Sequence, residues 1–196
     1  MKTLVPTLLA TAALALLPAP ARAAFVFTLT ESGNNVIIAG TGTLNTTALT
    51  YRNSANFGAF IDAGEALIYN GDVRPLSVNF YSGVIGPDDF GISTGARIAS
   101  SGTSPSVGIY GGLGVLVLRG DYVSGSLLSG TNTYNGATFA SIGFTPGTYV
   151  YTWGTGANAD SLTVTSVAPE PSTWALLGVG AGLLAARARR RRTSPV

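Results

Sequence analysis

Any chemistry in this chain has to come from carboxylates, hydroxyls and aromatic rings, because the sequence contains no histidine and no cysteine. The absence of histidine removes the usual general base, the Ser-His triad and most zinc sites. The absence of cysteine removes disulfides and thiol chemistry. An enzyme built on this sequence would have to work with carboxylates.

The carboxylates are few and scattered. Asp88 and Asp89 are adjacent, so on a strand they would point to opposite faces, whereas paired glycosidase carboxylates converge about 5 to 9.5 Å apart. Asp62, Glu65 and Asp72 could meet in the fold, but aspartates in such segments more often stabilise turns. We therefore predict that the protein is not an enzyme, has no catalytic residues and needs no cofactor.

Two short segments offer oxygen ligands of the kind that calcium prefers, namely Asn70-Gly71-Asp72 and Gly86-Pro87-Asp88-Asp89. Neither has the spacing of an EF-hand or of a nonapeptide repeat. The sequence therefore predicts no metal site, and it leaves calcium binding open.

Three aromatic residues form the candidate ligand platform of the sequence. Tyr149, Tyr151 and Trp153 have the same parity and so share one face of a strand. This face could fill a core or stack against sugar rings. The core is the favoured interpretation, because Val150 and Thr152 form a natural half-exposed face on the other side.

The elements that would position these residues are β-strands. In residues 24–168, Phe25, Phe27 and Leu29 alternate with smaller or polar residues, and further short apolar runs are separated by Gly, Pro, Asn and Asp. This pattern predicts an all-β fold, a single antiparallel β-sandwich or jelly-roll-like domain. Eight residues among those expected to be buried are Phe25, Phe27, Val115, Val117, Tyr149, Tyr151, Leu162 and Val164.

Local turn signals add detail to this prediction. Asn135-Gly136 predicts a type I′ hairpin between 131–134 and 137–140, and Thr145-Pro146-Gly147-Thr148 predicts a type II turn. The apolar run Leu113–Leu118 is expected to lie centrally in a sheet. The Ser-, Thr- and Gly-rich stretch 91–112 is expected to form long surface loops.

The N-terminus reads as an export signal. Lys2 supplies the positive n-region, residues 4–17 the apolar h-region, and Ala21-Arg22-Ala23 the cleavage pattern of small residues. We therefore expect signal peptidase to remove residues 1–23, so that the mature chain begins at Ala24.

The C-terminus reads as a membrane-held tail. Pro169-Glu170-Pro171 precedes an uncharged apolar segment, residues 174–186, which predicts a single transmembrane helix. Residues 172–186 would span about 22 Å as a helix, short for a hydrocarbon core of about 30 Å. An amphipathic helix docked on the domain is disfavoured because no polar face is left. The segment is followed by a basic stop formed by Arg187, Arg189, Arg190, Arg191 and Arg192.

Net charge excludes one class of partner. The whole chain has a formal charge of +2, but seven of its eleven basic residues lie in the two ends. Residues 24–168 keep four arginines against eight carboxylates, a net charge of −4. A nucleic-acid footprint needs clustered Lys and Arg, so no nucleic-acid partner is expected.

The order of motif, apolar helix and basic tail in residues 169–196 resembles the PEP-CTERM sorting signal of exported proteins of Gram-negative bacteria. The body is similar to a recurrent ectodomain type of such proteins. The resemblance rests on the segments 40–46, 86–91, 122–130, 145–154 and 159–163. It implies processing by an exosortase-type membrane protease and an exported β-rich domain, and it transfers no catalytic residues.

The sequence thus divides into a signal peptide (1–23), a β-sandwich ectodomain (24–168) and a sorting signal (169–196). The expected route is an intermediate held in the inner membrane, followed by the cell surface or extracellular matrix. Two functions remain open. The first is a non-catalytic, structural surface or matrix protein, and the second is a carbohydrate-binding module acting on exopolysaccharide.

Overall fold

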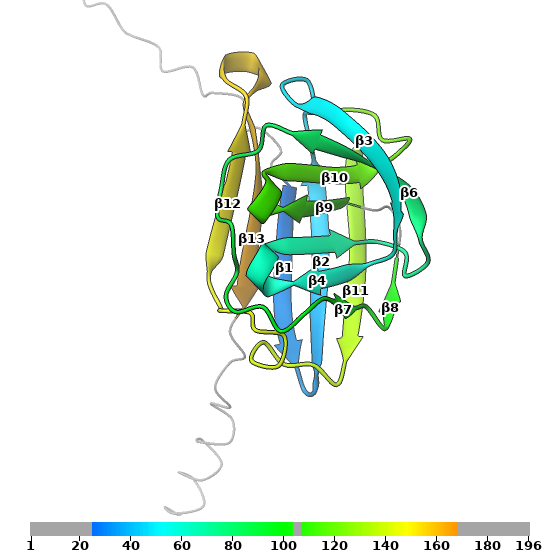
Figure 1. Cartoon of the computed structure of the whole chain (residues 1–196), viewed down its shortest axis with the longest axis vertical. Helices are drawn as coiled ribbons and strands as arrows, with labels where there is room; N and C mark the ends of the chain where they lie inside the picture. Colours follow the sequence, from blue (N-terminus) through cyan, green and yellow to red (C-terminus); the bar gives the residue numbers. More distant parts are fainter. Residues whose placement is uncertain (1–24, 104–106, 168–196) are drawn as a thin grey trace, which may run out of the picture.

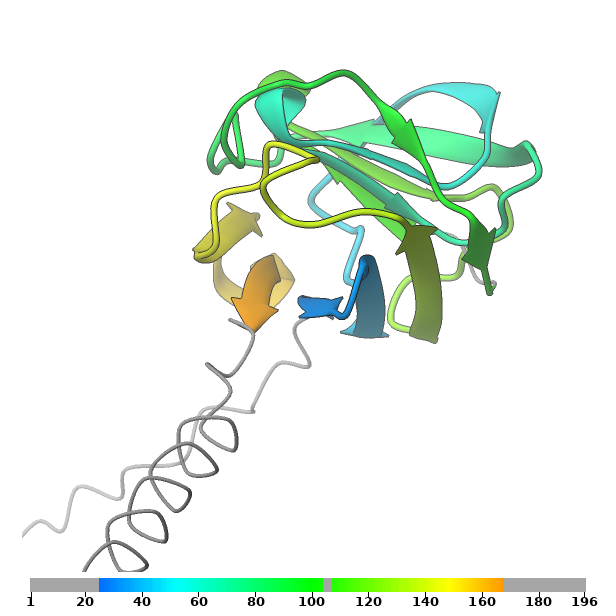
Figure 2. The ribbon, with the colours of Figure 1, turned by 90° about the horizontal axis from the view of Figure 1, so that it is seen from below.

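A computed structural model describes residues 25–103 and 107–167. This part of the chain folds into two β-sheets and three 3-10 turns, and it contains no α-helix. The sheets pack face to face, as the two views in Figure 1 and Figure 2 show. The prediction of an all-β domain is therefore confirmed.

The first sheet, sheet A, has six strands in the order β12-β13-β1-β2-β11-β8. All of its neighbouring pairs are antiparallel except β1 and β13, which are parallel, with Phe25 opposite Leu162. The prediction of a purely antiparallel sandwich is therefore wrong at this pair. Parallel neighbours need a long connection, and here nearly the whole domain connects them. The strands are β12 (Thr148–Trp153), β13 (Asp160–Val167), β1 (Phe25–Ser32), β2 (Asn35–Thr43), β11 (Leu127–Asn135) and β8 (Ser101–Gly102).

The second sheet, sheet B, has seven strands in the order β3-β6-β10-β9-β5-β4-β7, and all of its pairs are antiparallel. In Figure 1 its strands run across those of sheet A. The strands are β3 (Thr50–Phe57), β6 (Leu76–Ser82), β10 (Val115–Arg119), β9 (Val107–Tyr110), β5 (Leu67–Asn70), β4 (Phe60–Asp62) and β7 (Arg97–Ile98), and the 3-10 turns are η1 (Ala63–Glu65), η2 (Gly111–Leu113) and η3 (Gly156–Asn158).

The prediction that the apolar run Leu113–Leu118 lies centrally in a sheet is confirmed by strand β10. It has a neighbour on each side, and Val115–Leu118 are all buried. Leu113, however, belongs to the turn η2 and is 57% exposed, so the strand starts two residues later than expected. Strand β9 falls within the stretch that was expected to be loop.

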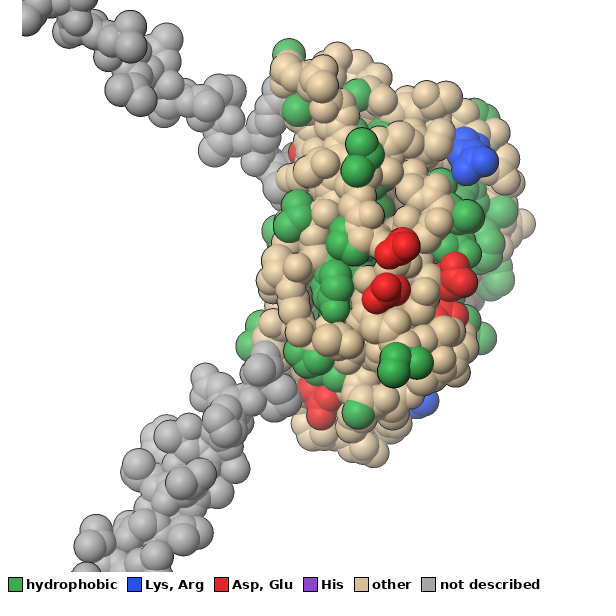
Figure 3. All heavy atoms as spheres, turned by 60° about the vertical axis from the view of Figure 1, so that its left-hand side comes forward, with side chains coloured by type: hydrophobic (Ala, Val, Ile, Leu, Met, Phe, Trp, Pro, Cys, Tyr) green, Lys and Arg blue, Asp and Glu red, His purple; other side chains and the backbone are tan. Residues whose placement is uncertain are grey.

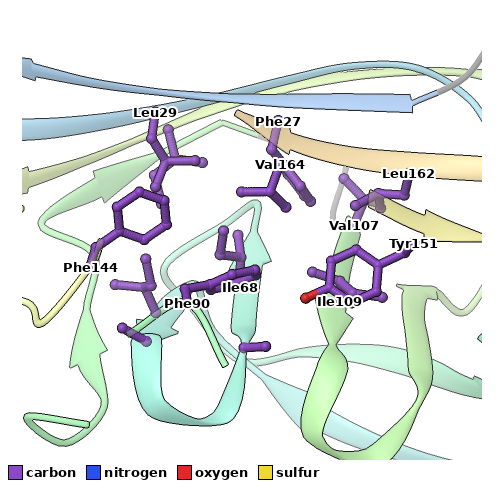
Figure 4. Packing of buried hydrophobic residues seen from close by; sticks show 14 of the residues in the cluster. Phe27, Leu29, Ile68, Phe90, Val107, Ile109, Phe144, Tyr151, Leu162 and Val164 are labelled. Carbon is purple, nitrogen blue, oxygen red and sulfur yellow. The ribbon is translucent and has the colours of Figure 1, made fainter. Parts of the chain in front are cut away.

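The main core lies between the sheets. Phe27 and Leu29 of β1 and Val164 of β13 point from sheet A toward Ile68 and Ile109 of sheet B (Figure 4). This is the period-2 alternation read from the sequence, which places every second side chain on the inner face. Of the eight residues expected to be buried, seven are, and Tyr149 is half-buried.

The loop after β6 closes the outer edge of β12. Ile85 and Thr152 exchange two backbone hydrogen bonds of 2.9 Å each. Further along the loop, Phe90 is fully buried, with its ring centroid 4.9 Å from that of Tyr149 and 6.3 Å from that of Tyr151. Segment 86–91 is therefore an anchor that covers a sheet edge, and edges left open invite pairing with other chains.

Both predicted turn types are wrong. Gly136 has the expected positive φ of 62°, but Asn135 does not, and residues 137–140 form no strand. Strand β11 pairs instead with β2 and β8. Gly147 also lacks positive φ. Its carbonyl accepts from the amide of Ser166 at 3.0 Å, and its amide donates to the hydroxyl of Ser166 at 2.8 Å, next to the β12–β13 pairing.

A buried asparagine joins the two sheets. Asn132 of β11 is fully buried, its Oδ1 accepts from the amide of Gly71 at 2.7 Å, and its Nδ2 donates to the carbonyl of Gly71 at 2.9 Å. The same Nδ2 donates to the carbonyl of Ser101 at 3.1 Å. One side chain thus satisfies three backbone groups beyond its own strand.

Replacing Asn132 with alanine is expected to destabilise the domain by roughly 2–4 kcal/mol, because buried backbone groups would lose their partners. Chemical denaturation of the variant and wild type measures this difference. Asn135→Ala, on the same strand with an exposed side chain, is the control and should change the free energy of unfolding by less than about 0.5 kcal/mol. Equal losses in the two variants would contradict the proposed role of Asn132.

Candidate functional site

The aromatic row singled out from the sequence lies inside the sandwich. Tyr151 and Trp153 are 0% and 2% exposed, and Tyr149 is half-buried with its hydroxyl donating to the carbonyls of Thr145 and Phe90. The indole of Trp153 donates to the carbonyl of Asn45 at 2.7 Å. The burial supports the core interpretation of this row, and no sugar ring can stack on the two buried side chains.

The other sequence-predicted sites lie outside the described residues. These are the signal-peptide cleavage residues Ala21, Ala23 and Ala24, the sorting motif Pro169, Glu170 and Pro171, the apolar segment 174–186, and the basic stop at Arg187 and Arg189–Arg192. Within the described ranges, no helix is long and apolar enough to cross a membrane.

Most of the described carboxylates are engaged in hydrogen bonds or ion pairs within the protein. Asp62 accepts hydrogen bonds from the Gly64 amide and the Ser93 hydroxyl, and Asp89 accepts from the Gly91 amide. Asp72 pairs with the Arg74 guanidinium at 2.7 Å, and hydrogen bonds from Arg74 lower the pKa of Asp72 to about 2. Across residues 25–103 and 107–167, no three Asp or Glu side chains converge as metal ligands.

The candidate site lies on the solvent side of sheet B. A buried floor of Tyr69, Val78, Val115 and Val117 is covered by the half-buried rings of Phe60, Phe80 and Tyr110. These residues occupy alternate positions of β4, β5, β6, β9 and β10, so they share the face that points away from the main core. The second apolar face is visible in the sequence only as the uninterrupted apolar run of β10, which is typical of strands covered on both sides.

Aromatic rings line a hollow on this face. Its volume is about 160 Å³, and it is lined by Phe57, Phe60, Leu67, Tyr69, Phe80, Tyr110 and Val117. We call these seven residues the aromatic groove. The ring of Phe57 lies 5.8 Å from that of Phe60 and 5.7 Å from that of Phe80, and Phe57 is 36% exposed.

Gly108 of β9 leaves room for one of these rings to pack against the backbone. Gly108 lies opposite Tyr69 on one neighbouring strand and opposite Val117 on the other. A Cβ at Gly108 would lie 2.9 Å from a ring carbon of Tyr69 and 2.6 Å from the carbonyl oxygen of Ile68. Any larger residue at position 108 would clash with the Tyr69 ring, so glycine is needed for this ring to pack against β9.

Polar groups border one end of the aromatic groove. The hydroxyl of Tyr110 donates to Oε2 of Glu65 at 3.1 Å. Burial raises the pKa of Tyr110, and the bond to Glu65 raises it further, so the phenol stays protonated at neutral pH. Glu65 is exposed and has acceptor capacity left for a ligand hydroxyl.

A second hollow adjoins the aromatic groove and shares Phe80 with it. Its volume is about 450 Å³, and its lining is Arg52, Asn53, Phe80, Leu113 and Val115. We call it the arginine hollow. The register of β3 against β6 shifts between Tyr51 and Asn53, which leaves Arg52 as the extra residue of a β-bulge. Bulges redirect side chains, and this one lets two consecutive residues line the same hollow.

Charge is sparse around these surfaces. Figure 3 shows one side of the domain, on which most atoms are uncharged, hydrophobic side chains lie toward both the left and the right, and a few acidic side chains lie between them. Three of the four described arginines have protein partners: Arg74 pairs with Asp72, Arg119 with Asp121, and Arg97 with the carbonyls of Asn135 and Gly136. In the described part of the chain, Arg52 has no such partner.

Comparison with known proteins identifies the tail. The family model of the PEP-CTERM protein-sorting motif matches residues 167–192, so the chain carries a PEP-CTERM domain. No curated protein and no solved structure matches the chain. The motif implies an exported protein that is sorted by an exosortase and has a membrane-anchored intermediate. The match starts at Val167, the last residue of β13, so the sandwich itself lies almost wholly outside it.

Proposed function

We propose that this PEP-CTERM protein is a non-catalytic surface or matrix protein that binds extracellular polysaccharide through the aromatic groove. The observation that carries the proposal is the row of partly exposed rings on the solvent side of sheet B. Contiguous exposed apolar patches are typical of interaction sites.

The dimensions and chemistry of the aromatic groove suit a sugar ring. A volume of about 160 Å³ matches one pyranose unit in size, and the apolar C–H face of such a ring packs against the negative face of an aromatic ring. Glu65 and the Tyr110 hydroxyl stand at the border, where sugar hydroxyls would emerge. Aromatic floors with a few convergent polar groups are the usual form of small-ligand sites.

Binding without catalysis is supported by the same geometry. Glu65 accepts a hydrogen bond from the lining residue Tyr110, and Asp62 is engaged by Gly64 and Ser93. Most glycoside hydrolases use two carboxylates that face each other across the scissile bond. The groove therefore favours adsorption to a polymer over its cleavage.

Phe57→Ala and Tyr110→Ala are each expected to weaken binding to purified extracellular polysaccharide about tenfold, equivalent to about 1.4 kcal/mol, through loss of ring contacts. Affinity electrophoresis of the full-length protein in detergent, with the polysaccharide cast into the gel, measures this change.

The control is Tyr51→Ala. Tyr51 is 54% exposed, and it lies opposite Tyr81, on the other side of the bulge from Asn53. It should bind like wild type. Unchanged retardation of Phe57→Ala and Tyr110→Ala, with thermal unfolding like that of wild type, would contradict the groove as a binding site and leave the purely structural role.

A further inference from the structure

We infer that the ligand carries a carboxylate, as in a uronic acid unit, and that Arg52 in the arginine hollow binds it while the adjoining unit occupies the aromatic groove. This inference rests on the proposed function and specifies its substrate class.

The position of Arg52 depends on the β-bulge in β3. Without the register shift between Tyr51 and Asn53, consecutive residues of β3 would point to opposite faces. With it, Arg52 and Asn53 line the same hollow as Phe80. A planar donor fork beside a second amide donor matches the two oxygens of a carboxylate.

Charge complementarity selects an anion at this position. The arginine hollow has no carboxylate in its lining, and Arg52 has no partner among the residues that the structure describes. Glu65 accepts from Tyr110 at the border of the aromatic groove. Glu65 would repel a carboxylate, so the anionic group of the ligand belongs at the Arg52 end and a hydroxyl at the Glu65 end.

The two hollows are neighbours on this face of sheet B, because Phe80 lines both. A polymer crossing Phe80 would therefore place one unit beside Arg52 and the next against Phe57, Phe60 and Tyr110. Elsewhere, Arg74 and Arg119 are held by Asp72 and Asp121, which leaves them poorly suited to compete for the same anion.

The test compares polymers that differ only in charge. Polygalacturonate and alginate are each paired with their carboxyl-reduced form, in which every carboxylate is a primary alcohol. Affinity of the full-length protein in detergent is measured for each polymer at low and high salt. Wild type should bind at least one acidic polymer about tenfold more tightly than its reduced form, and the preference should shrink as salt screens the pair.

Arg52→Ala should abolish this preference while retaining the affinity for the reduced polymer. Arg52→Lys keeps the charge but not the planar fork, so it should restore part of the preference. Asn56→Ala, an exposed substitution on the same strand, is the matched control for folding and should behave like wild type.

The outcomes separate this inference from the proposed function. If wild type binds acidic and reduced polymers equally, and Phe57→Ala weakens both, the polysaccharide site stands and the carboxylate inference is wrong. If Arg52→Ala keeps the preference for the acidic polymer, Arg52 is not the anion ligand. If none of the four polymers binds, the inference is overturned, while the assay with purified extracellular polysaccharide still decides the proposed function.

Discussion

Glu170→Ala is expected to leave the C-terminal tail uncut, so that the full-length protein accumulates in the membrane fraction and little processed protein reaches the surface or the medium. Glu170 lies between Pro169 and Pro171, within the matched sorting motif. Proline has no amide N–H to donate, so the glutamate side chain is the main polar group that a protease can recognise in this motif. The loss of processing should be close to complete.

Immunoblotting of fractions and mass spectrometry of the mature C-terminus measure this effect in a host that has the exosortase. Ser172→Ala, just after the motif, is the control and should be processed normally. A processed protein of normal abundance from Glu170→Ala would contradict the role of Glu170. A mature wild-type chain that still contains residues 174–186 would show that the segment is a permanent anchor.

Phe90→Ala is expected to destabilise the domain by about 3–5 kcal/mol, the usual cost of removing a fully buried phenylalanine ring. Phe90 is 0% exposed and packs edge-on against Tyr149 and Tyr151, and its carbonyl accepts from the amide of Thr145 at 2.8 Å. For a domain of this size the melting temperature should fall by roughly 10 °C or more. Thermal unfolding followed by circular dichroism measures the change.

Ile92→Ala is the matched control, because Ile92 lies two residues further along the same loop and is 78% exposed. It should melt within about 2 °C of wild type. Phe90→Leu keeps most of the apolar volume and should cost less than Phe90→Ala, so it remains measurable if the alanine variant does not accumulate. A melting temperature of Phe90→Ala equal to that of Ile92→Ala would show that the loop does not anchor the edge of β12.

The matched sorting motif and the β-domain meet at one residue. Val167 ends β13 and begins the match to the sorting motif. The strand is held from both sides, by β1 and by β12. Cleavage at or after Pro169 would therefore leave every described pairing of sheet A intact, which fits a domain that has to remain folded after sorting.

Local and compositional features were readable from the sequence. The lack of histidine led to the prediction of no catalysis, and the charge of residues 24–168 led to the prediction of no nucleic-acid partner. The patterns of the N-terminus and of the tail led to the export and sorting predictions. The alternation of Phe25, Phe27 and Leu29 predicted an inward face correctly, because side chains on a strand point to opposite sides whatever the strand pairs with.

Only the tertiary structure decided which strands are neighbours, and with it the candidate site. The parallel pairing of β1 and β13 joins the two ends of the domain, and no local pattern encodes so distant a contact. The turn at Asn135-Gly136 failed for the same reason, since β11 found its partners in β2 and β8 rather than in the residues that follow it. The aromatic groove takes its rings from five strands, and the bulge that brings Arg52 beside Phe80 exists only in the register of β3 against β6. Periodicity along one strand fixes which residues share a face, but the neighbours that complete a surface are set by the packing of the whole sheet.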